Sequence, residues 1–77
     1  MPHITVKLYP GRSEQQKSRL AEQIVKDVVA TLQNDEESVS IVIEEVQPRD
    51  WAEKVYKAEI AAKWDKLYKK PGYNPFE

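Results

Sequence analysis

The stretch SEQQKSRLAEQIVKDVVATL, residues 13–32, is the longest patterned segment of this 77-residue chain. Its apolar side chains recur every three or four residues; they are Leu20, Ala21, Ile24, Val25, Val28, Val29 and Leu32. This spacing gathers them on one face of a helix, with charged residues on the other. Ser13 and Gln16 have the spacing of a capping box, in which each side chain accepts a hydrogen bond from the backbone N–H of the other. We therefore predict an amphipathic helix with Ser13 as its N-cap.

The segments on both sides of this helix have the patterns of β-strands. In residues 2–9, Ile4, Val6 and Leu8 occupy every second position, which is typical of a strand with one buried face. Residues 39–46 are rich in β-branched side chains and apolar on both faces in their middle, as in a covered sheet. A strand, a helix and a second strand in one sheet form a right-handed crossover with parallel strands. The fold class predicted is therefore α/β, with a β-α-β unit.

The last third of the chain predicts another helix, which begins near Asp50. Its apolar stripe has helical spacing and consists of Tyr56, Ile60, Trp64 and Leu67. Residues 69–72, KKPG, supply positive charge and then helix breakers, so we expect the helix to end there. The tail at residues 73–77 has two aromatic side chains, which we expect to dock on a surface.

Length and composition exclude several classes of function. The 77 residues form one domain, residues 1–77, and 12 basic against 13 acidic residues give a net charge of −1. Bulk charge therefore predicts no binding of nucleic acid or of an anionic membrane. The longest apolar runs are short, so we expect no membrane-spanning segment, no secretory signal and a cytoplasmic location.

The counts of cysteine and histidine limit the chemistry further. The chain has no cysteine and one histidine, which excludes disulfides, thiolate zinc sites and cysteine nucleophiles, and we expect no metal site. A chain this short buries only roughly 60% of its unfolded surface and usually needs another source of stability. Two strands alone are not a stable sheet either. We therefore predict self-association, with a second copy supplying further strands.

Position 2 is the strongest candidate for chemistry. Proline here is small enough to permit removal of Met1, which would leave Pro2 as a free secondary amine. An α-amino group titrates near about 8 in water, and desolvation or a nearby cation lowers its pKa. Such an amine suits the abstraction of a proton beside a carbonyl. The alternative is structural, because a proline that begins an edge strand sacrifices no hydrogen bond. His3 is interpreted as a strand residue, and a catalytic or ligand role is the less favoured alternative.

Several segments resemble the 4-oxalocrotonate tautomerase family. They are PHITVKL at residues 2–8, GRSEQQK at 11–17 and SVSIVIEE at 38–45. Further residues are similar to the longer, dimeric PptA-type branch of this family: Gln47-Pro48, Trp51, Ala58-Glu59-Ile60 and KKPGY at 69–73. The resemblance covers nearly the whole chain and is more specific for the family than for a substrate.

The resemblance implies a β-α-β subunit whose strands join those of a second subunit in a four-stranded sheet, with helices on one face and an extra C-terminal helix. It implies a keto-enol tautomerase without a cofactor, acting on a small 2-oxo or enol acid, with Pro2 as general base. Arg12 takes the place of the family's substrate-binding arginine, and a guanidinium grips a carboxylate with two parallel hydrogen bonds. Trp51 takes the place of the family's aromatic wall, although a core or interface role for it is equally open.

The chain departs from the family at Ser40, where the best-studied members have a second arginine that polarises the substrate carbonyl. A serine hydroxyl donates one neutral hydrogen bond and supplies no charge to the developing oxyanion. We therefore expect a weaker or differently selective tautomerase. An aromatic enol such as phenylenolpyruvate fits this site better than a dicarboxylate. Arg49 or a residue of the partner subunit is the candidate to compensate.

Two other functions remain open. One is hydrolytic dehalogenation of a haloacrylate, against which the missing second arginine argues. The other is a non-catalytic, dimeric binding module that holds an aromatic ligand in a cleft around Trp51. The residues after Pro48 add surface that shorter family members lack, and they would block the stacking of dimers. A homodimer is therefore predicted rather than a hexamer.

Overall fold

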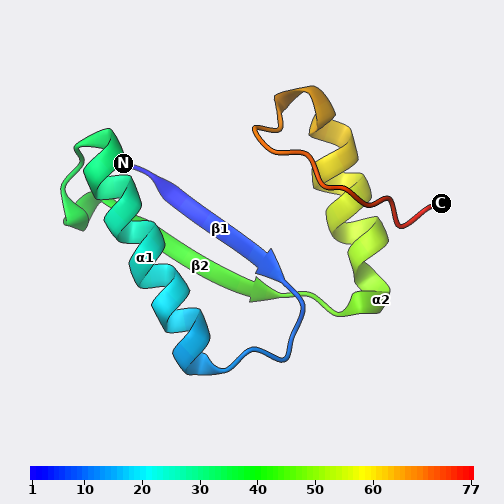
Figure 1. The fold of residues 1–77 in the computed structure, drawn as a ribbon, viewed down its shortest axis with the longest axis horizontal. Coiled ribbons are helices and arrows are strands. Elements are labelled where there is room, and N and C mark those ends of the chain that lie inside the picture. The colour runs from blue at the N-terminus through cyan, green and yellow to red at the C-terminus, as the bar shows by residue number, and fades with distance from the viewer. The chain divides into compact units, whose positions relative to one another are not determined.

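The computed structural model describes all 77 residues, which divide into two compact units, Met1–Glu45 and Val46–Glu77. The first unit contains strand β1 (His3–Leu8), helix α1 (Glu14–Leu32), a short 3-10 helix η1 (Glu36–Ser38) and strand β2 (Ser40–Glu45) (Figure 1). This is the β-α-β arrangement that the sequence predicts. Each strand is shorter than its predicted segment by one residue at either end.

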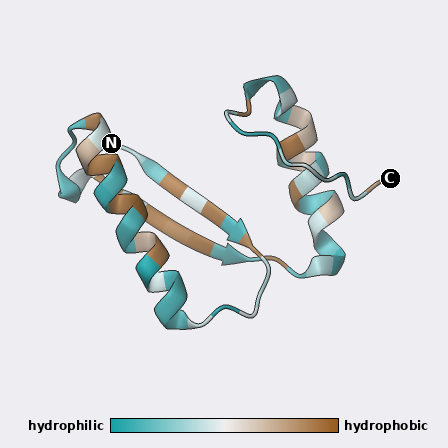
Figure 2. Cartoon of the chain, viewed as in Figure 1, coloured by the Kyte–Doolittle hydropathy of each residue, from teal (hydrophilic) through white to brown (hydrophobic).

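The two strands of the first unit are parallel and pair in a simple register. His3 lies opposite Ser40, and the pairing continues to Leu8 opposite Glu45. Helix α1 packs along one face of this pair, where Ile41 and Ile43 of β2 and Ala21 of α1 line a shared groove. Apolar residues are concentrated on β2 and recur along α1 (Figure 2). The other face of the sheet, which begins with His3 and Ser40, is not covered within this unit.

Helix α1 begins at the predicted cap. The Gln16 backbone N–H donates to Ser13 Oγ at 3.0 Å, and the Ser13 backbone N–H donates to Gln16 Oε1 at 3.0 Å. The helix ends at Leu32, and the C-cap residue Gln33 has a left-handed φ of 56°. The capping box predicted from Ser13 and Gln16 is confirmed, and it satisfies two donors that the first turn leaves unpaired.

Lys17 connects α1 to the end of β2. Its Nζ lies 2.8 Å from Glu14 Oε1, one turn earlier, and 3.5 Å from Glu45 Oε2. The hydrogen bond with Glu14 is the main cause that raises the Lys17 pKa above its usual value. The neighbouring Glu44 points to the opposite face of the sheet, where its carboxylate lies 3.9 Å from Lys7 Nζ. Adjacent strand residues point to opposite faces, so these two glutamates cannot act as a pair.

The second unit is helical from Pro48 to Lys66 and changes its winding twice. A short α-helix α2 (Pro48–Trp51) continues as a π-helix η2 (Ala52–Ile60) and then as a 3-10 helix η3 (Ala61–Lys66). The prediction of a start near Asp50 is wrong by two residues, because Pro48 takes the first helical position, where its missing N–H costs nothing. Leu67, predicted on the helical stripe, has extended backbone and lies just beyond the last turn.

The tail packs on this helical segment. Val55 and Tyr56 are each 5% exposed and form the buried core of the chain. The rings of Tyr73 and Phe76 lie 5.5 and 6.1 Å from the Tyr56 ring, within the range of favourable aromatic pairs. The expected docking of the two tail aromatics is therefore confirmed.

The first unit, in contrast, has no buried residue in a single copy of the chain. Helix α1 contains none, and Leu20, Leu32 and Val42 are 39%, 59% and 39% exposed. The half-buried apolar residues of α1 pack against one face of the sheet. The opposite face of the sheet and the far side of the helix have no covering element in this unit. The β-α-β unit therefore leaves apolar surface that a single chain does not bury.

Candidate functional site

Pro2 is held at the entrance to the sheet. It directly precedes β1, is half-buried, and its carbonyl oxygen accepts a hydrogen bond from the Ser40 backbone N–H at 3.1 Å. Met1 precedes it and is fully exposed. With Met1 attached, the Pro2 nitrogen is part of a peptide bond and has no basicity. The hydrogen bond with the Ser40 N–H engages the carbonyl of Pro2 and does not involve its nitrogen.

Ser40 has a partner that the sequence did not reveal. The His3 ring nitrogen Nδ1 lies 2.7 Å from Ser40 Oγ, and both side chains are exposed on the uncovered face of the sheet. The two residues are 37 positions apart and meet because the parallel register places them opposite each other. The sequence favours a plain strand residue at His3 and leaves a catalytic or ligand role as the alternative. The sequence signal for the pair is a polar residue at the second position of each predicted strand segment, residues 2–9 and 39–46.

Arg12 lies at the other end of β1. It is exposed in the loop that leads from β1 to α1, between Gly11 and Ser13. Gly11 has a φ of 121°, a conformation that glycine adopts without strain, so the chain can turn there. Six strand residues at about 3.3 Å each place roughly 20 Å between the two ends of β1. The structure therefore does not bring Arg12 to Pro2 within one chain (Figure 1).

Trp51 belongs to the second unit, at the end of α2. Its side chain is half-buried, and the indole N–H donates to the Tyr73 hydroxyl oxygen at 2.8 Å. Arg49, two residues earlier, is exposed. The ring of Trp51 is therefore held by the C-terminal tail, while Arg49 is open to solvent.

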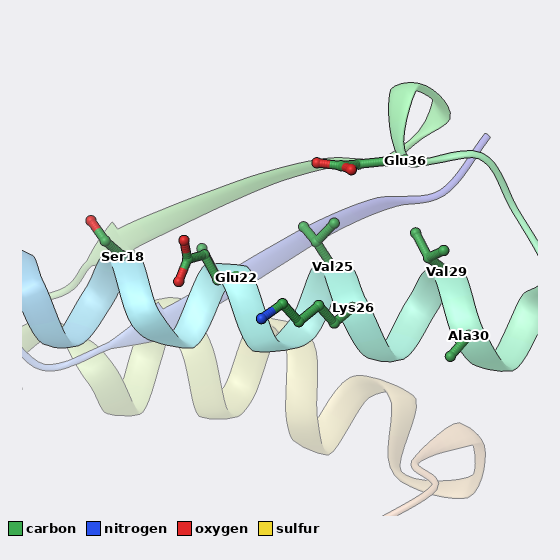
Figure 3. A pocket seen from close by; sticks show the side chains of 8 residues that line it. Ser18, Glu22, Val25, Lys26, Val29, Ala30 and Glu36 are labelled. Atoms are coloured by element: carbon green, nitrogen blue, oxygen red, sulfur yellow. The ribbon is translucent and has the colours of Figure 1, made fainter.

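A groove runs along α1, and none of the four predicted site residues lines it. It has a volume of about 560 Å³, and its lining consists of Ser18, Ala21, Glu22, Val25, Lys26, Val29, Ala30 and Glu36. Figure 3 shows Val25 and Val29 pointing from α1 toward the side where β2 and η1 lie. These are the positions of the predicted apolar face of the helix. The groove therefore exposes part of this apolar face, bordered by polar and charged side chains, in the single chain.

Two further observations concern metals and membranes. No three His, Asp or Glu side chains of the chain come together in a way that could hold a metal ion. Neither α1 nor the helical segment from Pro48 combines the length and apolar character that a membrane-spanning helix needs.

Comparison with known proteins identifies relatives over almost the full length. A family model described as "Tautomerase enzyme" matches residues 2–59, beginning at Pro2. Tautomerase PptA of Cronobacter sakazakii is 45% identical over 74 residues, covering 95% of this chain and 97% of the relative. Tautomerase PptA of Escherichia coli is 40% identical over 75 residues, covering 96% and 99%. Among solved structures, TomN, a 4-oxalocrotonate tautomerase homologue of the tomaymycin biosynthetic pathway, superimposes with a TM-score of 0.64 at 31% identity, covering 83% of this chain and 95% of TomN.

Proposed function

This chain belongs to the tautomerase family, and from that premise we propose that it is a keto-enol tautomerase of small 2-oxo or enol acids with Pro2 as its general base. The observation that supports this best is the state of Pro2. It is held half-buried by the bond between its carbonyl and Ser40 N–H, and a fully exposed Met1 precedes it. Removal of Met1 then produces a secondary amine at a fixed position.

The reaction needs one base and one group that holds the substrate. The Pro2 nitrogen accepts the proton of the enol hydroxyl and returns a proton to the neighbouring carbon, so the enol becomes the ketone with no net change in protons. The guanidinium of Arg12 binds the substrate carboxylate with two parallel hydrogen bonds. No cofactor takes part.

The positions of Pro2 and Arg12 support a homodimer with a shared site. They lie at opposite ends of β1, so one chain does not supply both to one substrate. In a dimer with a two-fold axis through the sheet, the partner's strands are antiparallel to the strands of the first chain. The carboxyl end of a strand in one chain then lies toward the amino end of a strand in the other. The sheet then has four strands, and the open apolar groove along α1 is covered by the second copy. The 77 residues then act as one tautomerase domain.

The substrate proposed is an aromatic enol such as phenylenolpyruvate. Ser40 supplies no positive charge, which disfavours a dicarboxylate that needs two cations. Trp51 supplies an apolar aromatic surface, and the bond to Tyr73 holds its ring in one orientation. An aromatic monocarboxylate matches one guanidinium and one indole. We place the reaction in the cytoplasm.

The test uses protein whose intact mass shows that Met1 has been removed. We expect this protein to accelerate ketonisation of phenylenolpyruvate, followed by the loss of enol absorbance. Pro2→Ala should lower the rate of ketonisation by on the order of a hundred- to ten-thousandfold, the usual effect of removing a general base. The same sequence with Met1 retained is a matched control, because it keeps the proline and blocks only its nitrogen.

Two outcomes would overturn the proposal. If Pro2→Ala or the Met1-blocked protein turns over the enol as fast as the processed protein, Pro2 is not the base. If an aromatic acid quenches tryptophan fluorescence and no turnover occurs with any enol tested, the chain is the alternative binding module.

A further inference from the structure

The pair formed by His3 and Ser40 has no role in the proposed mechanism so far. Both residues begin their strands, so they lie at the same end of the sheet as Pro2. Ser40 contacts both neighbours: its backbone N–H donates to the Pro2 carbonyl at 3.1 Å, and its Oγ lies 2.7 Å from His3 Nδ1. Three residues are thus joined at the place where the reaction is proposed to occur.

The chemistry of the pair depends on which atom donates. A serine hydroxyl has one hydrogen to donate and can accept as well, and a histidine ring nitrogen donates only when it is protonated. If Ser40 donated to Nδ1, its hydrogen would be used within the protein. If Nδ1–H donates to Ser40 Oγ, the Ser40 hydrogen is free to point at a ligand. Hydrogen bonds in series also polarise one another, so the second arrangement makes the hydroxyl a better donor.

The surroundings of the pair allow a ligand to reach it. Both side chains are exposed, and neither takes part in an ion pair. The charged residues further along the same face, Lys7 and Glu44, lie 3.9 Å from each other at the opposite end of the strands. A substrate oxygen beside Pro2 would therefore meet the Ser40 hydroxyl without competition from a neighbouring carboxylate on this face.

We propose that the Ser40 hydroxyl donates a hydrogen bond to the substrate oxygen on which negative charge develops, and that His3 is the positioning residue that orients it, through Nδ1–H donation to Oγ. This deepens the proposed function and rests on it. In this proposal two neutral side chains polarise the substrate carbonyl, in place of the second arginine of other family members. It stabilises the transition state more than the bound enol, so its loss lowers kcat rather than raising KM.

The test measures kcat and KM for phenylenolpyruvate in processed protein. Ser40→Ala removes the donor and should lower kcat by on the order of a hundredfold, as for loss of one oxyanion donor. His3→Leu removes only the orienting bond and should lower kcat by about tenfold, with KM changed by less than about threefold. His3→Asn keeps a nitrogen donor near the position of Nδ1 and should restore most of the activity.

The decisive measurement is His3→Leu in the Ser40→Ala background. Because His3 acts through Ser40, the double variant should be no slower than Ser40→Ala alone. Thr5→Val is the matched control. It lies two residues along β1 on the same face, opposite Val42, and should leave kcat unchanged.

Three results would overturn the inference. The first is that His3→Leu lowers kcat equally in the parent protein and in Ser40→Ala. The others are that His3→Leu raises KM without lowering kcat, or that the kcat of His3→Asn is as low as that of His3→Leu. Circular dichroism and light scattering show that each variant is folded and associated. If Pro2→Ala abolishes turnover while the His3 variants match the parent protein, only this inference fails. If Pro2→Ala is as fast as the parent protein, the proposed function itself fails.

Discussion

The indole N–H of Trp51 donates a hydrogen bond to the hydroxyl oxygen of Tyr73 at 2.8 Å, across 22 residues of sequence. The same Tyr73 ring packs 5.5 Å from the ring of Tyr56, which is 5% exposed. One tail residue therefore contacts both the core of the second unit and the ring proposed to face the substrate. This makes the tail part of the support for Trp51.

Replacing Tyr73 by Phe should separate these two contacts. Tyr73→Phe keeps the ring against Tyr56 and removes the acceptor for the indole, so we expect a loss of about 0.5–1.5 kcal/mol in the free energy of unfolding. Tryptophan fluorescence should also shift as the Trp51 indole loses its partner. Tyr68→Phe is the control, since Tyr68 is fully exposed to solvent. Equal effects of the two variants would contradict this role of Tyr73.

The cap of α1 gives a second prediction. Ser13→Ala removes the acceptor for the Gln16 backbone N–H, so the free energy of unfolding should fall by about 1 kcal/mol. Denaturant titration at a fixed protein concentration measures this, since the stability of an oligomer depends on concentration. Gln23→Ala, an exposed substitution within the same helix, should have little effect or a slightly stabilising one. A destabilisation by Gln23→Ala as large as that by Ser13→Ala would argue against the cap.

Lys17 predicts a pH dependence of stability. Its pKa is raised in the folded chain above the ordinary 10.5, chiefly by the hydrogen bond with Glu14. The folded state therefore holds this proton more tightly than the unfolded state does. The stabilisation is fully present below about pH 10 and is lost as pH rises through the raised value.

Unfolding of the parent protein and Lys17→Met between pH 8 and 11 checks this. The parent should be the more stable at pH 8, and the difference should shrink above pH 10.5, the ordinary value. Lys57→Met is the control, since its pair with Glu53 at 3.6 Å is exposed and contributes less than about 1 kcal/mol. A difference that stays constant up to pH 11 would show that Lys17 acts through packing alone.

The open groove along α1 predicts where association occurs. Val25 points into it (Figure 3), so Val25→Asp places a charge in the surface that the second copy is proposed to cover. We expect light scattering to show the mass of one chain for this variant at micromolar concentration, and the mass of two chains for the parent protein. Loss of association should also lower the activity, because the proposed site needs both copies. Gln23→Asp puts the same charge on the exposed side of α1 and should leave the dimer intact; dissociation by both variants would place the interface elsewhere.

Position 40 gives a prediction about selectivity. Ser40→Arg adds a cation beside Pro2, and charge-assisted hydrogen bonds contribute about 1.5–3 kcal/mol. The ratio of kcat/KM for a dicarboxylate enol to that for phenylenolpyruvate should therefore rise by at least about tenfold. Ser40→Met, of similar length and without charge, should not change this ratio. A ratio unchanged in Ser40→Arg would show that position 40 does not face the substrate.

The β-α-β unit could be predicted from the sequence because its signals are local. Alternating apolar residues in β1, helical spacing in α1 and the capping residues Ser13 and Gln16 each involve neighbours in the chain. The last helix starts at Pro48, two residues before the predicted position near Asp50, because proline is compatible with the first helical position as well as with a loop. The changes of winding after Trp51 have no residue signature in that stretch.

The candidate site divides in the same way. Pro2, Arg12, Ser40 and Trp51 could be named from the order of residues and from resemblance to a family, since chemistry and spacing are written in the chain. That Arg12 lies at the far end of β1 from Pro2 follows from the predicted strand between them, whereas the meeting of His3 and Ser40 was decided by the tertiary structure. The reason is physical: the register between two strands determines which distant side chains lie opposite each other, and register is not a property of either segment alone.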